Sequence, residues 1–140
     1  MKNLEINSKV LGSVFTNCYF LMNNETKEMV IVDPADSPEQ IEQAVLRMEG
    51  KPVAIFLTHG HYDHILAANA VREKFGAKIY ACQAEEEVLM NPQLSMTIYE
   101  DPSYVVKADV LLEDLEVFEA AGFSVQMIHT PGHTLSLIHI

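Results

Sequence analysis

The first third of the chain alternates short apolar stretches with polar breaks, which is typical of strands joined by tight turns. Residues 4–10 alternate apolar and polar side chains, whereas residues 18–22 and 28–32 are short apolar runs. The polar residues 23–27 separate these two runs, so the pattern predicts a β-hairpin.

A helix is expected after this strand region. Asp33 and the proline that follows it end the last strand, and segment 37–40 (Ser-Pro-Glu-Gln) has the form of a capping box with proline in the first turn. Apolar residues then recur at the spacing of one helix face as far as Met48. Gly50 suits the C-terminal cap. These features predict one helix between Ser37 and Gly50.

The middle of the chain predicts a strand, a polar turn and a second helix. Residues 53–57 are uniformly apolar, as in a strand that is buried on both faces of a sheet. The polar turn 58–63 follows directly. A helix is then expected over residues 64–75, closed by Gly76, and a short strand over residues 78–80.

The last third contains weaker signals. Residues 84–90 predict an acidic helix, and we assign its three consecutive glutamates, 85–87, to a solvated face. No regular element is expected over residues 93–107. Residues 109–118 predict a pair of strands and residues 124–129 a final strand. Strands followed by strand–helix alternation predict an α/β layered domain with at least one mixed sheet.

Composition narrows the class of protein. A length of 140 residues favours one domain. The 9 basic and 20 acidic side chains give a net charge of −11, which disfavours a nucleic-acid or anionic membrane partner. No apolar run has the length of a membrane span, and the first residues lack a signal-peptide pattern. Since Cys18 and Cys82 form no disulfide framework, we expect a cytoplasmic protein.

The segment 58–64, Thr-His-Gly-His-Tyr-Asp-His, carries the candidate chemistry. It places the imidazoles of His59, His61 and His64 and the carboxylate of Asp63 directly after a buried strand. A glycine within the segment allows the histidines to converge on one point. Neutral imidazoles bind zinc at about 2.0–2.1 Å, and carboxylate oxygens bind at a similar distance. One such residue alone is more often a turn or cap residue, but the set indicates a metal site.

A second segment, 129–134, again follows an apolar strand and has the sequence His-Thr-Pro-Gly-His-Thr. Its Pro-Gly turn allows His133 to point back across the sheet. With the first segment it supplies a third imidazole. A three-histidine zinc site leaves one position for a water, whose pKa falls to about 7 on the metal.

Together these segments, Thr-His-x-His-x-Asp-His and Thr-Pro-Gly-His-Thr, resemble the metallo-β-lactamase fold superfamily. Within it the chain is most similar to the glyoxalase II-like branch, the hydroxyacylglutathione hydrolase-like metallo-hydrolases. Residues 16–20 (Thr-Asn-Cys-Tyr-Phe) and 31–34 (Ile-Val-Asp-Pro) also match the opening of the family pattern. The resemblance implies an α/β fold, the four-layer αββα sandwich, of which this chain holds mainly the N-terminal half.

The resemblance also assigns ligands. His59, His61 and His133 would hold a first metal, and Asp63 and His64 would contribute to a second. Asp63 is the residue of this set that we expect to be catalytic. The implied metal is Zn²⁺, two ions per complete domain, with iron or manganese as alternatives.

Asp33 matches a family position that orients a ligand histidine through a hydrogen bond. Its alternative role, a turn residue at a strand end, is equally favoured. The family further implies a metal-dependent hydrolase of a small-molecule thioester such as hydroxyacyl-glutathione, with a metal-bound hydroxide as nucleophile. The alternatives are a catalytically incomplete chain that only binds metal, or another activity of the fold: a lactonase, a β-lactamase or a diiron redox protein.

The family pattern continues beyond residue 134 with an aspartate that bridges two metals and a last histidine, and this chain lacks both. We therefore expect residues 1–134 to form a partial domain. Residues 135–140, Leu-Ser-Leu-Ile-His-Ile, equal the translation of a common transposon-end sequencing adapter, so we expect a non-native tail. A gene sequence that runs past codon 140 to a natural stop would contradict this expectation.

Overall fold

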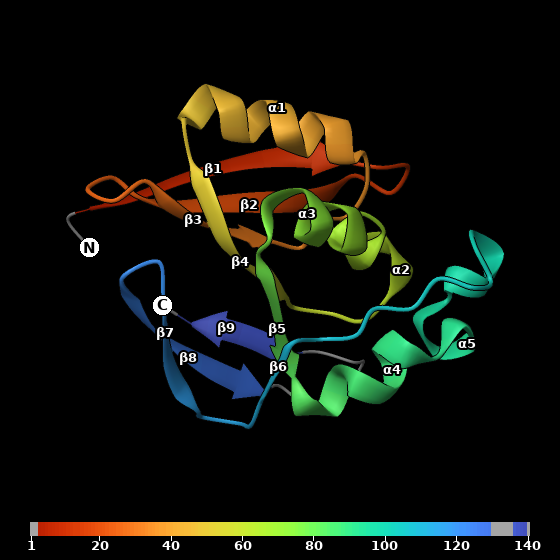
Figure 1. Ribbon diagram of the computed structural model, residues 1–140. Coiled ribbons are helices and arrows are strands. Elements are labelled where there is room, and N and C mark those ends of the chain that lie inside the picture. Colours follow the sequence, from red (N-terminus) through yellow and green to blue (C-terminus); the bar gives the residue numbers. More distant parts are fainter. Residues whose placement is uncertain (1–2, 130–135, 140) are drawn as a thin grey trace.

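The computed structural model describes residues 3–129 and 136–139, which form two β-sheets and several helices (Figure 1). The larger sheet has the strand order β1-β2-β3-β4-β5-β6 and the smaller one β7-β8-β9. The strands of the larger sheet are β1 (Leu4–Leu11), β2 (Thr16–Asn23), β3 (Glu28–Val32), β4 (Lys51–Leu57), β5 (Lys78–Cys82) and β6 (Val110–Leu112).

The smaller sheet comes from the C-terminal part of the chain, whereas the helices are distributed between the strands of the larger sheet. The smaller sheet consists of β7 (Val117–Ala120), β8 (Phe123–His129) and β9 (Ser136–His139). The helices are α1 (Pro38–Met48), α2 (Tyr62–Ile65), α3 (Ala68–Phe75), α4 (Glu86–Met90) and α5 (Pro92–Ser95), with 3-10 turns η1 (Gln83–Glu85) and η2 (Thr97–Tyr99).

The larger sheet is mixed, as the sequence predicts. β1, β2 and β3 are antiparallel neighbours, and the predicted hairpin is β2–β3, in which Phe20 lies opposite Ile31. From β3 to β6 each neighbouring pair is parallel. Parallel strands end at the same edge of a sheet, which brings the loops that follow β3 and β4 together.

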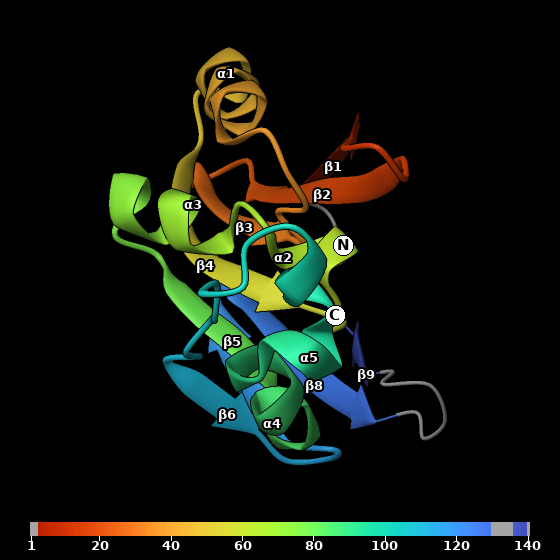
Figure 2. The same ribbon diagram turned by 90° about the vertical axis from the view of Figure 1, so that its right-hand side faces the viewer.

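The larger sheet lies between helices and the smaller sheet (Figures 1 and 2). On one face, Ile41 of α1 and Val71 of α3 belong to the same buried cluster as Ile55 of β4. On the other face, Phe56 of β4 packs edge-on against Phe118 of β7, with ring centroids 5.6 Å apart. The prediction that β4 is buried on both faces is confirmed. The resulting α/β/β layering is consistent with the N-terminal half of the αββα sandwich.

The caps of α1 differ from the prediction. Ser37 precedes the helix with a left-handed φ of 51°, and its side chain makes no capping hydrogen bond, so the predicted capping box is absent. At the other end, Glu49 adopts the left-handed cap conformation that we assigned to Gly50. Gly50 lies close to the flexible side chain of Met29, whose Cε would be 2.3 Å from a Cβ at this position.

The predicted helix over residues 64–75 is wrong as a single element. It is divided into α2 and α3, because the N–H groups of Leu66 and Ala67 donate to the carbonyls of Ala35 and Pro34. These two bonds attach the start of the helical region to the loop after β3. The predicted C-terminal cap is confirmed, with Gly76 at a left-handed φ of 67°.

The two strands predicted over residues 109–118 are present, but they do not pair with each other. The first is β6, which pairs with β5 in the larger sheet, whereas the second is the beginning of β7 of the smaller sheet. The stretch 93–107, for which no element is predicted, contains most of α5 and all of η2. In the described part of the chain, no helix is long and apolar enough to cross a membrane.

Candidate metal centre

The candidate centre lies at the carboxyl ends of two neighbouring parallel strands, β3 and β4. Asp33 directly follows β3, and the loop that begins with Thr58 and His59 directly follows β4. His64 lies in α2, which is attached to the loop after β3 by the two backbone hydrogen bonds described above. Backbone pairing therefore fixes the positions of residues that are distant in the sequence.

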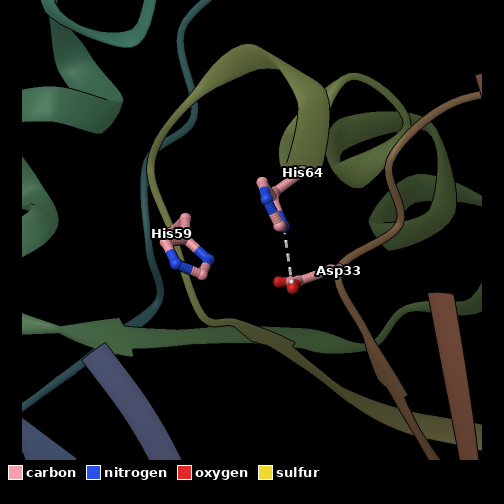
Figure 3. Close-up of side chains that lie close together, drawn as sticks. All are labelled: Asp33, His59 and His64. Atoms are coloured by element: carbon pink, nitrogen blue, oxygen red, sulfur yellow. Dashed lines mark hydrogen bonds and ion pairs between the residues drawn. The ribbon is translucent and has the colours of Figure 1, made fainter. Parts of the chain in front are cut away.

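Asp33 connects these loops. It is 5% exposed, and its backbone adopts a left-handed φ of 54°. One carboxylate oxygen, Oδ1, accepts the Thr58 N–H at 2.8 Å. The other, Oδ2, accepts the Thr58 hydroxyl and contacts Nδ1 of His64 at 3.0 Å (Figure 3). A single buried carboxylate thus holds both the start of the loop and the histidine of α2.

This network defines where the imidazole protons reside. The Thr58 hydroxyl uses its only hydrogen on Asp33, so in its 2.8 Å contact with Nδ1 of His59 it is the acceptor. Nδ1 of His64 likewise donates to the Asp33 carboxylate. In their neutral forms, both imidazoles therefore carry their proton on Nδ1 and have the Nε2 lone pair available to a metal, an assignment that follows from the hydrogen-bond network.

The side chains of Asp33, His59 and His64 lie close enough to share a cation. One potential ligand atom from each lies within 4.8 Å of the others. The two imidazole rings are 4.4 Å apart between centroids, and Figure 3 shows them on the same side of the loop as Asp33. Imidazole nitrogens and carboxylate oxygens are the ligand types that zinc and iron bind. The residues present therefore fit the implied metal.

The two histidines titrate differently. Burial, with the nearby His64, lowers the pKa of His59. For His64, burial acts to lower the pKa, but the hydrogen bond to Asp33 and the charges of Asp33 and Asp63 outweigh it and raise the pKa. A metal binds only the neutral imidazole, so the environment of His59 already favours the form that a metal needs.

The remaining predicted ligands are placed around this cluster. Asp63 lies beside it, with Oδ2 3.5 Å from Nε2 of His64. His61 is half-buried at the N-terminal end of α2, and the described residues do not place it or Asp63 within the three-residue cluster. His133 lies outside the described residues.

A cavity of about 410 Å³ opens directly onto the cluster. Asp33, His59 and His64 line it together with residues 14–17, which form the end of the β1–β2 turn and the start of β2. Phe15 in this turn is 77% exposed. Our sequence analysis did not select this turn, although an apolar residue between two strands is a signal for a binding loop.

Glu85 was assigned wrongly to a solvated face. It is 3% exposed, and its carboxylate accepts a hydrogen bond from the N–H of Gly60, between His59 and His61. Burial raises its pKa to about 7. The signal was present in the sequence, since the buried Val88 and Leu89 follow at the i+3 and i+4 positions of a helical face.

This chain combines α/β/β layers with histidines and a carboxylate at the carboxyl ends of parallel strands. These features are typical of αββα domains that bind metals. Within that class, the chain belongs to the Metallo-beta-lactamase superfamily, whose sequence profile matches residues 11–140.

Several curated proteins are similar to this chain. "Probable metallo-hydrolase YqgX" of Bacillus subtilis is 32% identical over 126 residues, which cover 89% of this chain and 59% of the relative. "Probable polyketide biosynthesis zinc-dependent hydrolase BaeB" of Bacillus velezensis is 30% identical, with 84% and 46% covered. Hydroxyacylglutathione hydrolase GloC of Haemophilus influenzae is 27% identical, with 84% and 57% covered. The chain spans about half to three fifths of the length of these relatives.

Crystal structures of similar proteins show the same fold. The B3 metallo-beta-lactamase BLEG-1 is 34% identical with a TM-score of 0.85, and the alignment covers 96% of this chain and 65% of that one. The class B3 di-zinc metallo-beta-lactamase LRA-12, from an Alaskan soil metagenome, is 25% identical with a TM-score of 0.72, covering 87% and 48%. A di-iron-bound form of TTHA1623, 24% identical with a TM-score of 0.73 and covering 94% and 64%, shares the fold.

Proposed function

We propose that this chain carries the metal-binding half of a zinc-dependent hydrolase that cleaves a small-molecule thioester such as hydroxyacyl-glutathione. The observation that carries the proposal is the convergence of His59, His64 and Asp33 beside an open cavity of about 410 Å³. The similarity to the hydroxyacylglutathione hydrolase GloC supports the substrate class.

The metal ligands proposed from the sequence are His59, His61 and His133 for one ion and Asp63 and His64 for another. Zinc held by such ligands would polarise a carbonyl and would lower the pKa of a water to about 7. His61 directly precedes α2 and Asp63 lies in it, with Oδ2 of Asp63 3.5 Å from Nε2 of His64.

The protein's own residues orient these ligands. Asp33 holds the Nδ1 proton of His64 directly and that of His59 through the Thr58 hydroxyl, so both Nε2 atoms are presented as bases. Partners of this kind fix the tautomer and orientation of a metal-binding histidine. The cavity wall formed by the β1–β2 turn, with its exposed Phe15, offers an apolar surface for the acyl part of a substrate.

A second candidate is hydrolysis of a β-lactam. It is favoured by the 34% identity and the TM-score of 0.85 to the B3 metallo-beta-lactamase BLEG-1. Thioesters and β-lactams are both activated acyl groups, so the same ligand set serves either reaction. The distinction lies in the residues that line the substrate cavity.

The two activities are tested with the purified chain loaded with zinc. Release of free thiol from a hydroxyacyl-glutathione is measured in parallel with opening of a chromogenic cephalosporin. Thioester turnover that disappears in His59→Ala supports the proposal. Turnover of the cephalosporin alone overturns the thioester assignment in favour of the second candidate.

Zinc content is measured on the same samples. A chain that binds zinc through His59 but cleaves neither compound contradicts hydrolysis by this polypeptide and leaves a metal-binding chain without turnover. Activity that persists unchanged in His59→Ala contradicts the proposed centre itself.

A further inference from the structure

The metal loop has a second support on the side opposite Asp33. We propose that Glu85 is a positioning residue, whose buried carboxylate holds the N–H of Gly60 and so fixes the directions in which His59 and His61 leave the loop. The inference rests on the proposed function only in that it takes this loop to be the metal-binding one.

Glu85 is buried although it is charged in its ordinary state. It is the last residue of η1 and is 3% exposed, whereas the neighbouring Glu86 and Glu87 are exposed. Its carboxylate accepts the N–H of Gly60. A hydrogen bond between a carboxylate and a backbone N–H is about twice as strong as one between neutral groups.

Next to Glu85, the backbone of the loop packs closely against α4. A Cβ added to Gly60 would lie 2.8 Å from Cγ1 of Val88 and 3.6 Å from Cδ2 of Leu89. Gly60 itself is buried and does not have a positive φ. The glycine is therefore required for close packing, and the loop is held between α4 and the Asp33 network.

The position is unfavourable for stability alone. Oε1 of Glu85 is buried and has no hydrogen-bond partner among the described residues. A carboxylate buried with one unpaired oxygen costs more free energy than an apolar side chain of the same size. We therefore explain the glutamate at position 85 by its hydrogen bond to the Gly60 N–H, which lies between two predicted metal ligands.

The test compares three substitutions in the full chain. Glu85→Gln keeps an acceptor oxygen, Glu85→Leu removes it at similar volume, and Glu86→Leu is the matched control at the exposed neighbour. Zinc dissociation constants are measured by competition with a chromophoric chelator. Glu85→Leu is expected to weaken zinc binding by about 10- to 100-fold, the range for partners that orient a ligand. Glu85→Gln and Glu86→Leu are expected to stay within about threefold of the unsubstituted chain.

Hydrogen exchange of the Gly60 amide gives a readout that does not depend on metal. We expect this amide to be protected in the zinc-free chain and in Glu85→Gln, and to exchange faster in Glu85→Leu while the amides of β4 stay protected. Unchanged zinc affinity in a folded Glu85→Leu overturns the inference. If Glu85→Leu does not fold, a Gly60 amide that is unprotected in the unsubstituted chain overturns it equally.

Neither measurement requires turnover. A chain that shows this pattern but hydrolyses no thioester contradicts the proposed substrate and leaves the role of Glu85 supported. A chain that binds no zinc at any concentration tested overturns both.

Discussion

The two sides of the loop between β4 and α2 differ in chemistry and in exposure. On the front, Asp33, Thr58, His59 and His64 form a connected polar network that borders an open cavity. On the back, Gly60 packs against apolar residues of α4 and meets one polar side chain, Glu85.

The two sides of the loop therefore have different roles. The front sets proton positions, because each of its hydrogen bonds ends on an imidazole or on the carboxylate that holds one. The back sets the path of the backbone, because its contacts are made by Gly60, which has no side chain. Substitutions on the front should therefore change metal binding, and those on the back should change the stability of the loop as well.

The largest effect is expected on the front, at Asp33. Asp33→Asn keeps the shape but replaces one acceptor oxygen with a donor, so the Thr58 hydroxyl and His64 no longer share an acceptor. We expect zinc affinity to fall by about 10- to 100-fold. Competition with a chelator measures it, with Asp101→Asn, at an exposed aspartate after η2, as a control for the lost charge. Equal affinities in the two variants would contradict the network's role.

On the back, Gly60→Ala is expected to reduce the free energy of unfolding by about 1–3 kcal/mol, the usual cost of overpacking. The new Cβ would contact Cγ1 of Val88 at 2.8 Å. Denaturant unfolding measures the loss. The double substitution Gly60→Ala with Val88→Ala should cost less than the sum of the two single changes, because the smaller residue makes room. Strict additivity would show that the close approach is not the cause.

Much of the front was predictable from sequence. The apolar run of β4, the histidines after it and Asp33 at the end of β3 are local patterns, and a family resemblance connected them. Thr58 was not selected, because a threonine in a turn carries no signal of its own. Its part depends on Asp33, which is 25 residues away in sequence and is brought close by strand pairing.

The back was mispredicted for related reasons. Three consecutive glutamates suggest a solvated face, and only the packing of η1 and α4 against the loop shows that Glu85 points inward. The division of the helix after the motif likewise depends on carbonyls of the loop after β3, which no local pattern indicates. The burial of Glu85 and the division of the helix both depend on contacts between residues that are far apart in the sequence.

A smaller effect on the front is expected from Thr58→Val, which keeps the volume but removes the hydroxyl between Asp33 and His59. His59 should lose its fixed tautomer, whereas His64 keeps its direct bond to Asp33. We expect zinc affinity to fall by about tenfold or less, since one of the two imidazoles is affected. Nitrogen chemical shifts of the imidazoles report the tautomers, and a change at His64 alone would contradict the proposed order of the network.

The smallest expected effect is on the pH dependence of the free energy of unfolding, in which the contribution of the back can be separated from that of the front. On the front, the pKa of His59 is lowered and that of His64 is raised, so their contributions to stability between pH 5 and 8 oppose each other. On the back, burial raises the pKa of Glu85 from 4.5 to about 7, so the folded chain keeps a proton that the unfolded chain releases in this window.

The stabilisation from that proton is fully present below pH 4.5 and is lost as the pH rises through about 7. The metal-free chain should therefore lose stability relative to Glu85→Gln over this range, by less than about 1.4 kcal/mol per pH unit. Denaturant unfolding at several pH values measures the difference, with Glu86→Gln as the control for net charge. A difference that grows in favour of the unsubstituted chain as the pH rises would show that the Glu85 carboxylate is stabilised in its charged form, and the back of the loop would then be as polar in character as the front.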